Sequence, residues 1–149
     1  MKPEETVDYH VRYVWHAMSR MYNQLGSKHD ISTSMGFVLL NIRTEGGSQA
    51  TKIAPLMGLE SRSLTRMLRS MEERGLIYRK RDSVDRRSVH IYLTEEGLRR
   101  KRITQETIKN FNEEIRKEIS MKDLNKFFEV MTKVNQFITD NKSLERLAS

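Results

Sequence analysis

The chain has 149 residues, of which 37% are hydrophobic and 32% charged, and its formal net charge is +7. This length suits one domain with its own core, and the charge balance suits helices with one wet face better than a compact enzyme core. The absence of cysteine excludes disulfides, thiol redox sensing and thiolate metal sites, while the positive charge favours a polyanionic partner, either a nucleic acid or an anionic membrane.

The first residues do not have the pattern of a secretory signal, because acidic residues come early and no apolar segment follows them. The longest apolar run, 37–40, is far shorter than a membrane span and is expected to be a piece of core. We therefore expect a cytoplasmic protein that has no membrane partner.

Hydrophobic periodicity predicts two helices in the first third of the chain. Apolar residues recur every three to four positions from Glu4 to about Leu25, which is typical of an amphipathic helix. A loop over 26–30 is predicted to end this helix. Ser32 can cap a second helix that runs to about Thr44.

The next segment is predicted to form a helix-turn-helix. Ser48 is expected to cap a short helix, which Pro55 keeps short or bent because proline lacks a backbone donor. Gly58 is the natural left-handed residue of a tight turn between helices. The following helix is predicted over about 60–74, with a buried stripe formed by Leu64, Met67, Leu68 and Met71.

A β-hairpin and two further helices complete the predicted order, α-α-α-α-β-β-α-α. The strands are expected over 76–80 and 88–93, joined by a polar loop. Thr94 can cap a long helix over 95–118, and Ser120 can begin a last helix with a wide apolar face. The predicted fold class is mainly α with a small β-hairpin wing.

The helix over 60–74 is predicted to carry arginines opposite its buried stripe. Arg62, Arg66 and Arg69 are spaced i, i+4, i+7 and so form one ridge. Arginine can clamp guanine edges or hold phosphates, and Ser and Thr can do either more weakly. Base contacts are expected from the N-terminal part of the helix and a phosphate contact from Arg69. The candidate DNA contacts of this helix are Ser61, Arg62, Ser63, Thr65, Arg66 and Arg69.

The loop of the hairpin is the second candidate element. Its Arg86 and Arg87 are candidate contacts, because a narrow minor groove attracts arginine, and Asp85 is expected to orient a neighbouring arginine or to close the turn. Residues 61–90 hold nine lysines and arginines against four acidic residues, a net +5 of the chain's +7. The alternatives are a solvated helix face with Arg69 paired to Glu72 or Glu73, and a hairpin that only aids solubility.

Four short motifs give the chain a resemblance to a known family. They are LTRML at 64–68, E-x-x-G-L-I at 72–77, D-x-R at 85–87 and L-T-x-x-G at 93–97. Together with the helix order, they make the chain resemble the MarR (multiple antibiotic resistance regulator) family of bacterial transcription factors. Pro55 in the first helix of the helix-turn-helix departs from the family pattern.

The resemblance implies a sequence-specific double-stranded DNA-binding transcriptional regulator, with repression as the usual outcome and Arg87 as the arginine that enters the minor groove. It also implies a single domain over 1–149, with a winged helix-turn-helix lobe over 46–94 and dimerisation helices over 4–30 and 98–140. A homodimer on a pseudo-palindromic operator is expected. The wide apolar faces of the first and last helices favour a dimer independently, the alternative being a bundle within one chain.

By resemblance, a small effector would bind between the dimerisation helices and the winged lobe. Aromatic residues, methionine and histidine in the first two helices suit a small apolar or aromatic anion, fatty-acid-like or phenolic, although each side chain could instead serve ordinary packing. The candidate effector-pocket residues are His10, Tyr13, Trp15, His16, Tyr22, Met35 and Phe37. We predict no cofactor and no metal, because the histidine spacing does not suit metal ligands.

The sequence lacks the motifs of the common enzyme classes. No Ser-His-Asp grouping, phosphate loop or H-E-x-x-H motif appears, so we predict that the chain is not an enzyme. The competing interpretation is a basic helical dimer that binds RNA or anionic surfaces without sequence preference.

Overall fold

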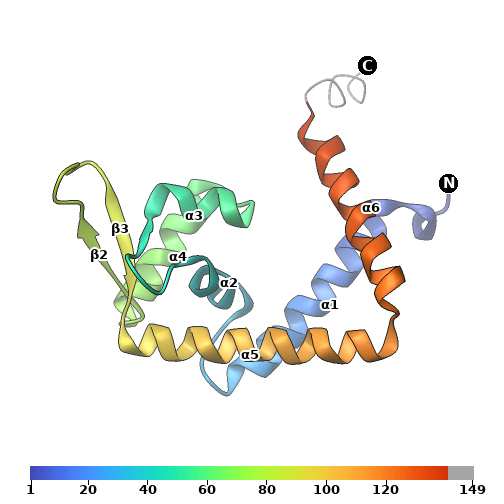
Figure 1. Ribbon diagram of the computed structural model, residues 1–149, viewed down its shortest axis with the longest axis horizontal. Coiled ribbons are helices and arrows are strands. Elements are labelled where there is room, and N and C mark those ends of the chain that lie inside the picture. The colour runs from blue at the N-terminus through green and yellow to red at the C-terminus, as the bar shows by residue number, and fades with distance from the viewer. Residues whose placement is uncertain (141–149) are drawn as a thin grey trace. The chain divides into compact units, whose positions relative to one another are not determined.

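The computed structural model describes residues 1–140 (Figure 1). It divides into two compact units, residues 1–107 and a second unit that begins at Ile108. The helices and strands are the 3-10 helix η1 (Pro3–Glu5), α1 (Val7–Ser27), α2 (Thr33–Asn41), β1 (Ser48–Gln49), α3 (Ala50–Met57), α4 (Ser61–Glu73), β2 (Ile77–Arg81), β3 (Val89–Leu93), α5 (Glu95–Glu118) and α6 (Met121–Thr139). The predicted mainly helical class with a small wing is confirmed, and the single domain predicted over 1–149 includes nine residues outside the described part.

The second helix ends earlier than the sequence suggested. Its start is as predicted, because the Ser32 hydroxyl accepts a hydrogen bond from the backbone nitrogen of Met35 at 3.3 Å. The predicted extension to Thr44 is wrong, since Ile42 already has an extended backbone conformation. The carbonyl oxygen of Ile42 instead accepts a hydrogen bond from the ammonium of Lys101, which is buried beside it.

The prediction that Ser48 caps a helix is wrong. Ser48 and Gln49 form the short strand β1, which pairs antiparallel with β3 through Ile91 and His90. Gln49 takes the N-cap position of α3, and the Ser48 hydroxyl accepts a hydrogen bond from the backbone nitrogen of Arg43 at 2.8 Å. The hairpin therefore becomes a three-stranded sheet in the order β1-β3-β2.

The helix-turn-helix forms around Gly58, whose φ of 63° lies in the left-handed region that glycine adopts without strain. Proline 55 lies inside the eight-residue α3, which is short as predicted. Helices α2, α3 and α4 pack with the sheet around one hydrophobic core. Its fully enclosed side chains are Val38, Leu39, Ile42, Ile53, Met71, Leu76, Ile77 and Ile91.

The L-T-x-x-G motif joins the sheet to α5. The Thr94 hydroxyl accepts a hydrogen bond from the backbone nitrogen of Gly97 at 3.0 Å, so the predicted cap is confirmed, and it donates to the carbonyl oxygen of Gly75. A side chain at Gly97 would overlap the carbonyl oxygen of Leu76. The motif therefore fixes where α5 leaves the winged lobe.

The second unit contains the last part of α5 and all of α6. Ser120 begins α6 as predicted, since its hydroxyl accepts a hydrogen bond from the backbone nitrogen of Asp123 at 3.2 Å. The apolar side chains of α6 remain largely exposed in the single chain: Met121, Phe127, Phe128, Val130, Phe137 and Ile138. Within residues 1–140, no helix is both long and apolar enough to cross a membrane.

Candidate nucleic-acid interface

Helix α4 buries one face and exposes the other, as its sequence predicts. Leu64, Leu68 and Met71 are almost completely buried in the core. The opposite face exposes the predicted contacts Ser61, Arg62, Thr65, Arg66 and Arg69, while Ser63 is half-buried. The Thr65 hydroxyl donates to the carbonyl oxygen of Ser61 at 2.8 Å, so its lone pairs remain available to an external donor.

The arginines of this face differ in their ion pairs. Arg69 contacts the carboxylate of Glu73 at 3.0 Å, and both side chains are mostly exposed. This pair is the one that the alternative interpretation expected. Within residues 1–140, Arg62 and Arg66 have no acidic partner, so their guanidinium groups can bind an external anion without first breaking an ion pair.

The tip of the wing is organised by Asp82, a residue that the sequence analysis did not single out. Its carboxylate accepts hydrogen bonds from the backbone nitrogens of Val84 at 2.8 Å and Asp85 at 3.0 Å. The backbone donors of Asp85 and then Val84 hold the pKa of Asp82 below its usual value. The signal for this turn was present in the sequence, because aspartate commonly accepts from backbone two and three residues ahead.

Asp85 closes the turn, and within residues 1–140 its carboxylate contacts the backbone of Arg87 and no arginine side chain. Its carboxylate accepts a hydrogen bond from the backbone nitrogen of Arg87 at 3.0 Å, and its carbonyl oxygen accepts from Ser88 at 2.9 Å. The side chains of Arg86 and Arg87 are exposed, with no acidic partner among the residues that the structure describes. The wing is therefore a fixed turn that carries two exposed cations available to an external anion.

A cluster of ion pairs joins the C-terminal end of α4 and the start of α5 to Asp30, in the turn between α1 and α2. Arg74 donates to the carbonyl oxygen of Asp30 at 3.0 Å and also contacts its carboxylate, while Arg100 donates to the same carbonyl at 2.7 Å. These contacts, those of Arg74 first, lower the pKa of Asp30. Glu96 binds both Arg99 and Arg100, which lowers its pKa to about 2.

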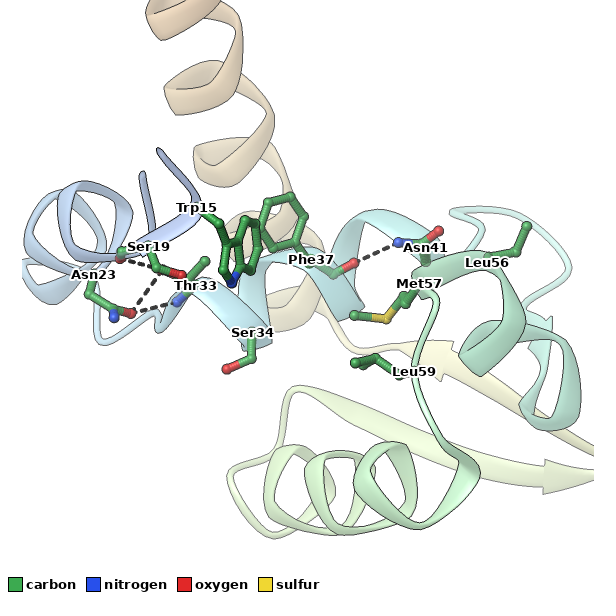
Figure 2. Close-up of a pocket in the computed structure, with 10 residues that line it drawn as sticks. All are labelled: Trp15, Ser19, Asn23, Thr33, Ser34, Phe37, Asn41, Leu56, Met57 and Leu59. Carbon is green, nitrogen blue, oxygen red and sulfur yellow. Dashed lines mark hydrogen bonds between the residues drawn. The ribbon is translucent and has the colours of Figure 1, made fainter. Parts of the chain in front are cut away.

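A cavity of about 440 Å³ lies within the first unit (Figure 2). Its wall is formed by α1, α2, the end of α3 and the turn that follows α3. Of the seven predicted effector-pocket residues, Trp15 and Phe37 line it, with ring centres 6.0 Å apart. The other lining residues are Ser19, Asn23, Thr33, Ser34, Asn41, Leu56, Met57 and Leu59.

The other five predicted pocket residues lie elsewhere. Tyr22 and Met35 are buried in packing, so the sequence could not distinguish them from the residues that line the cavity. His10 contacts the carbonyl oxygen of Glu4 at 2.7 Å, Tyr13 stacks on Tyr9, and His16 is exposed. These side chains belong to α1 but do not line the cavity, because only one face of that helix borders it. Within residues 1–140, no group of three or more histidine or acidic side chains is placed to hold a metal ion.

Comparison with known proteins identifies the winged segment. Residues 31–89 match the model of the MarR family. This segment of the chain is therefore similar to the MarR family.

Two curated relatives match about half of the chain. The HTH-type transcriptional regulator TtmR of Methylorubrum extorquens (strain PA1) is 35% identical over 82 residues, which are 55% of this chain and 42% of the relative. The organic hydroperoxide resistance transcriptional regulator of Bacillus subtilis (strain 168) is 39% identical over 80 residues, 54% of each chain. The chain thus aligns with about half the length of the curated relatives it matches.

Solved structures share the fold over most of the chain. The S. aureus MepR–DNA complex superposes with a TM-score of 0.81 at 23% identity, covering 88% of this chain and 97% of that one. CouR from Rhodococcus jostii RHA1, solved with p-coumaroyl-CoA, gives a TM-score of 0.78 at 20% identity, covering 90% of this chain and 94% of that one. At these identities the likeness establishes the winged helix fold.

Proposed function

We propose that this chain is a member of the MarR family and acts as a cytoplasmic, sequence-specific double-stranded DNA-binding transcriptional regulator. The main observation behind this proposal is that α4 and the wing lie within one compact unit and expose four arginines that have no acidic partner within residues 1–140: Arg62, Arg66, Arg86 and Arg87. Unpaired arginines on a helix that fits the major groove, with further arginines on an adjacent wing, form the combination that reads base edges and holds phosphates.

Within this proposal, the residues of α4 contact base edges and phosphates in the major groove, and those of the wing contact the minor groove. Ser61, Arg62, Ser63, Thr65 and Arg66 lie in the N-terminal half of α4, from which base contacts usually come. Arg69 lies about one turn further along α4. It would contact a phosphate in place of its ion pair with Glu73. Arg86 and Arg87 enter the minor groove from the turn that Asp82 and Asp85 fix.

The protein acts as a homodimer in this proposal. Phe127 and Ile138 of α6 are each 55% exposed in the single chain, and α1 also exposes Val7 and Val11. Large apolar faces of this kind are covered in obligate dimers. Two-fold symmetry then requires a pseudo-palindromic operator whose half-sites lie about 34 Å apart. Repression follows where the bound dimer blocks transcription, and a small molecule in the cavity beside Trp15 would regulate it.

The test is selection of binding sites from a pool of random duplexes. Wild-type protein is expected to enrich an inverted repeat, and sedimentation equilibrium at micromolar concentration is expected to give a dimer. The competing function, binding of RNA or anionic surfaces without sequence preference, would leave the duplex pool unenriched while retaining salt-dependent binding. That result would exclude the proposed function.

A further inference from the structure

The cavity beside Trp15 combines an aromatic wall with uncharged polar groups. Figure 2 shows the rings of Trp15 and Phe37 side by side at one part of the cavity, and Leu56, Met57 and Leu59 at another. Its remaining lining residues carry hydroxyl or amide side chains. None of the ten lining residues, all within the described chain, is charged.

Several polar atoms of the lining still have hydrogen-bonding capacity. The side-chain oxygen of Asn23 accepts two hydrogen bonds from Thr33, one from its backbone nitrogen at 2.8 Å and one from its hydroxyl at 3.0 Å. The NH₂ group of Asn23 is therefore available to a ligand. Asn41 uses its NH₂ to donate to the carbonyl oxygen of Phe37 at 2.9 Å, which leaves its oxygen as an acceptor. Within residues 1–140, the indole N–H of Trp15 and the hydroxyl of Ser34 make no hydrogen bond.

The start of α2 also borders the cavity, and two of its first backbone amides already have partners. The backbone nitrogen of Thr33 donates to the Asn23 side chain, and that of Met35 donates to the Ser32 hydroxyl. Helix N-termini bind anions through amides that have no such partner. A carboxylate entering this cavity would therefore lose water and gain only neutral side-chain donors, with no cation among the lining residues to offset its charge.

We infer that the cavity selects an uncharged, planar aromatic ligand that carries an amide, ketone or hydroxyl group, and that it excludes the corresponding carboxylate. The sequence alone suggested an aromatic anion, and the lining residues favour the neutral class instead. The inference rests on the proposed function for its regulatory meaning, because the same cavity is where an effector would act. The volume of about 440 Å³ suits a molecule of two or three fused or linked rings.

The experiment compares two compounds of the same shape, 2-naphthamide and 2-naphthoate, at neutral pH. Calorimetry measures affinity, and the indole N–H resonance of Trp15, the chain's one tryptophan, reports whether the compound occupies this cavity. The amide is expected to bind at least tenfold more tightly than the carboxylate and to shift the Trp15 resonance. Equal or tighter binding of the carboxylate would overturn the inference, as would the failure of both compounds to shift that resonance.

A charge inserted at the cavity provides the matched control. Ser34→Lys places a cation on an exposed lining position, so it should increase naphthoate affinity about tenfold and change naphthamide affinity little. Gln105→Lys adds the same charge at an exposed position that does not line the cavity and should change neither affinity. If both variants raise naphthoate affinity equally, the selectivity comes from overall charge and the inference fails.

Duplex binding without ligand separates the inference from the proposed function. If the amide preference holds but no duplex is recognised, the ligand class stands and the regulatory function falls. If the duplex is recognised with specificity but the carboxylate is preferred, the function stands and the ligand class is wrong.

Discussion

Replacement of Arg87 by alanine tests the role of the wing, because the structure separates this side chain from the turn that holds it. The turn depends on the backbone nitrogen of Arg87, which donates to the Asp85 carboxylate, and the exposed guanidinium has no acidic partner among residues 1–140. Alanine keeps the backbone donor, so Arg87→Ala should remove one cation per chain and leave the wing folded.

The magnitude follows from counterion release. The logarithm of the DNA-binding constant falls with the logarithm of salt concentration by about 0.9 for each phosphate that the protein neutralises. A dimer loses two such contacts, so its slope should become shallower by about 1.8, with a loss of about 30-fold in affinity at 0.15 M salt and about 200-fold at 0.05 M. The loss should be similar for operator and for unrelated duplexes, because the minor groove that Arg87 is proposed to enter presents a degenerate pattern of base edges, and the phosphates make its potential negative in any sequence.

The assay is fluorescence anisotropy with labelled duplexes over a range of salt concentrations. Lys109→Ala is the control, since it removes the same charge from an exposed position outside the winged lobe. Unchanged affinity and slope for Arg87→Ala would refute the reasoning. An equal loss for Lys109→Ala would show that net charge, and not the wing, controls binding.

Three further predictions concern base reading, the core and acid stability. Arg66→Ala should reduce discrimination between operator and mismatched duplexes by about 1–3 kcal/mol, and equal discrimination by wild type and variant in competition binding would contradict base contact by Arg66. Ile53→Ala should lower the free energy of unfolding by about 2–5 kcal/mol in urea titrations at fixed protein concentration, because Ile53 is completely buried; a loss below 1 kcal/mol would contradict close packing there. The pKa of Glu96 falls from 4.5 to about 2 in the folded chain, so its stabilising contribution is present above pH 4.5 and is lost as pH falls from 4.5 toward 2. Glu96→Gln should therefore flatten the decline of unfolding free energy in that window, and an identical pH profile would rule out this linkage.

Sequence periodicity and capping patterns predicted most helices because these signals are local. Leu64, Leu68 and Met71 repeat at helical spacing and indeed face the core, and Thr94 and Ser120 cap helices from within four residues. The exposure of the α4 arginines followed directly from the position of that buried stripe.

The features that the sequence did not reveal depend on residues far apart in the chain. Strand β1 exists because Ser48 lies opposite Ile91, and a two-residue strand has no periodicity of its own. The cavity lining depends on which sides of α1 and α2 meet, so Tyr22 and Trp15 could not be separated by composition. Asp30 contacts Arg74 and Arg100 across similarly long separations.

The central claim is that paired copies of α4 and the wing read two halves of one duplex. Hydroxyl-radical footprinting on the selected inverted repeat tests it most directly. We expect two-fold symmetric protection, with half-sites about 10 base pairs apart and flanking minor-groove protection that disappears in Arg87→Ala. Protection of a single patch, or flanking protection that persists in Arg87→Ala, would contradict the claim.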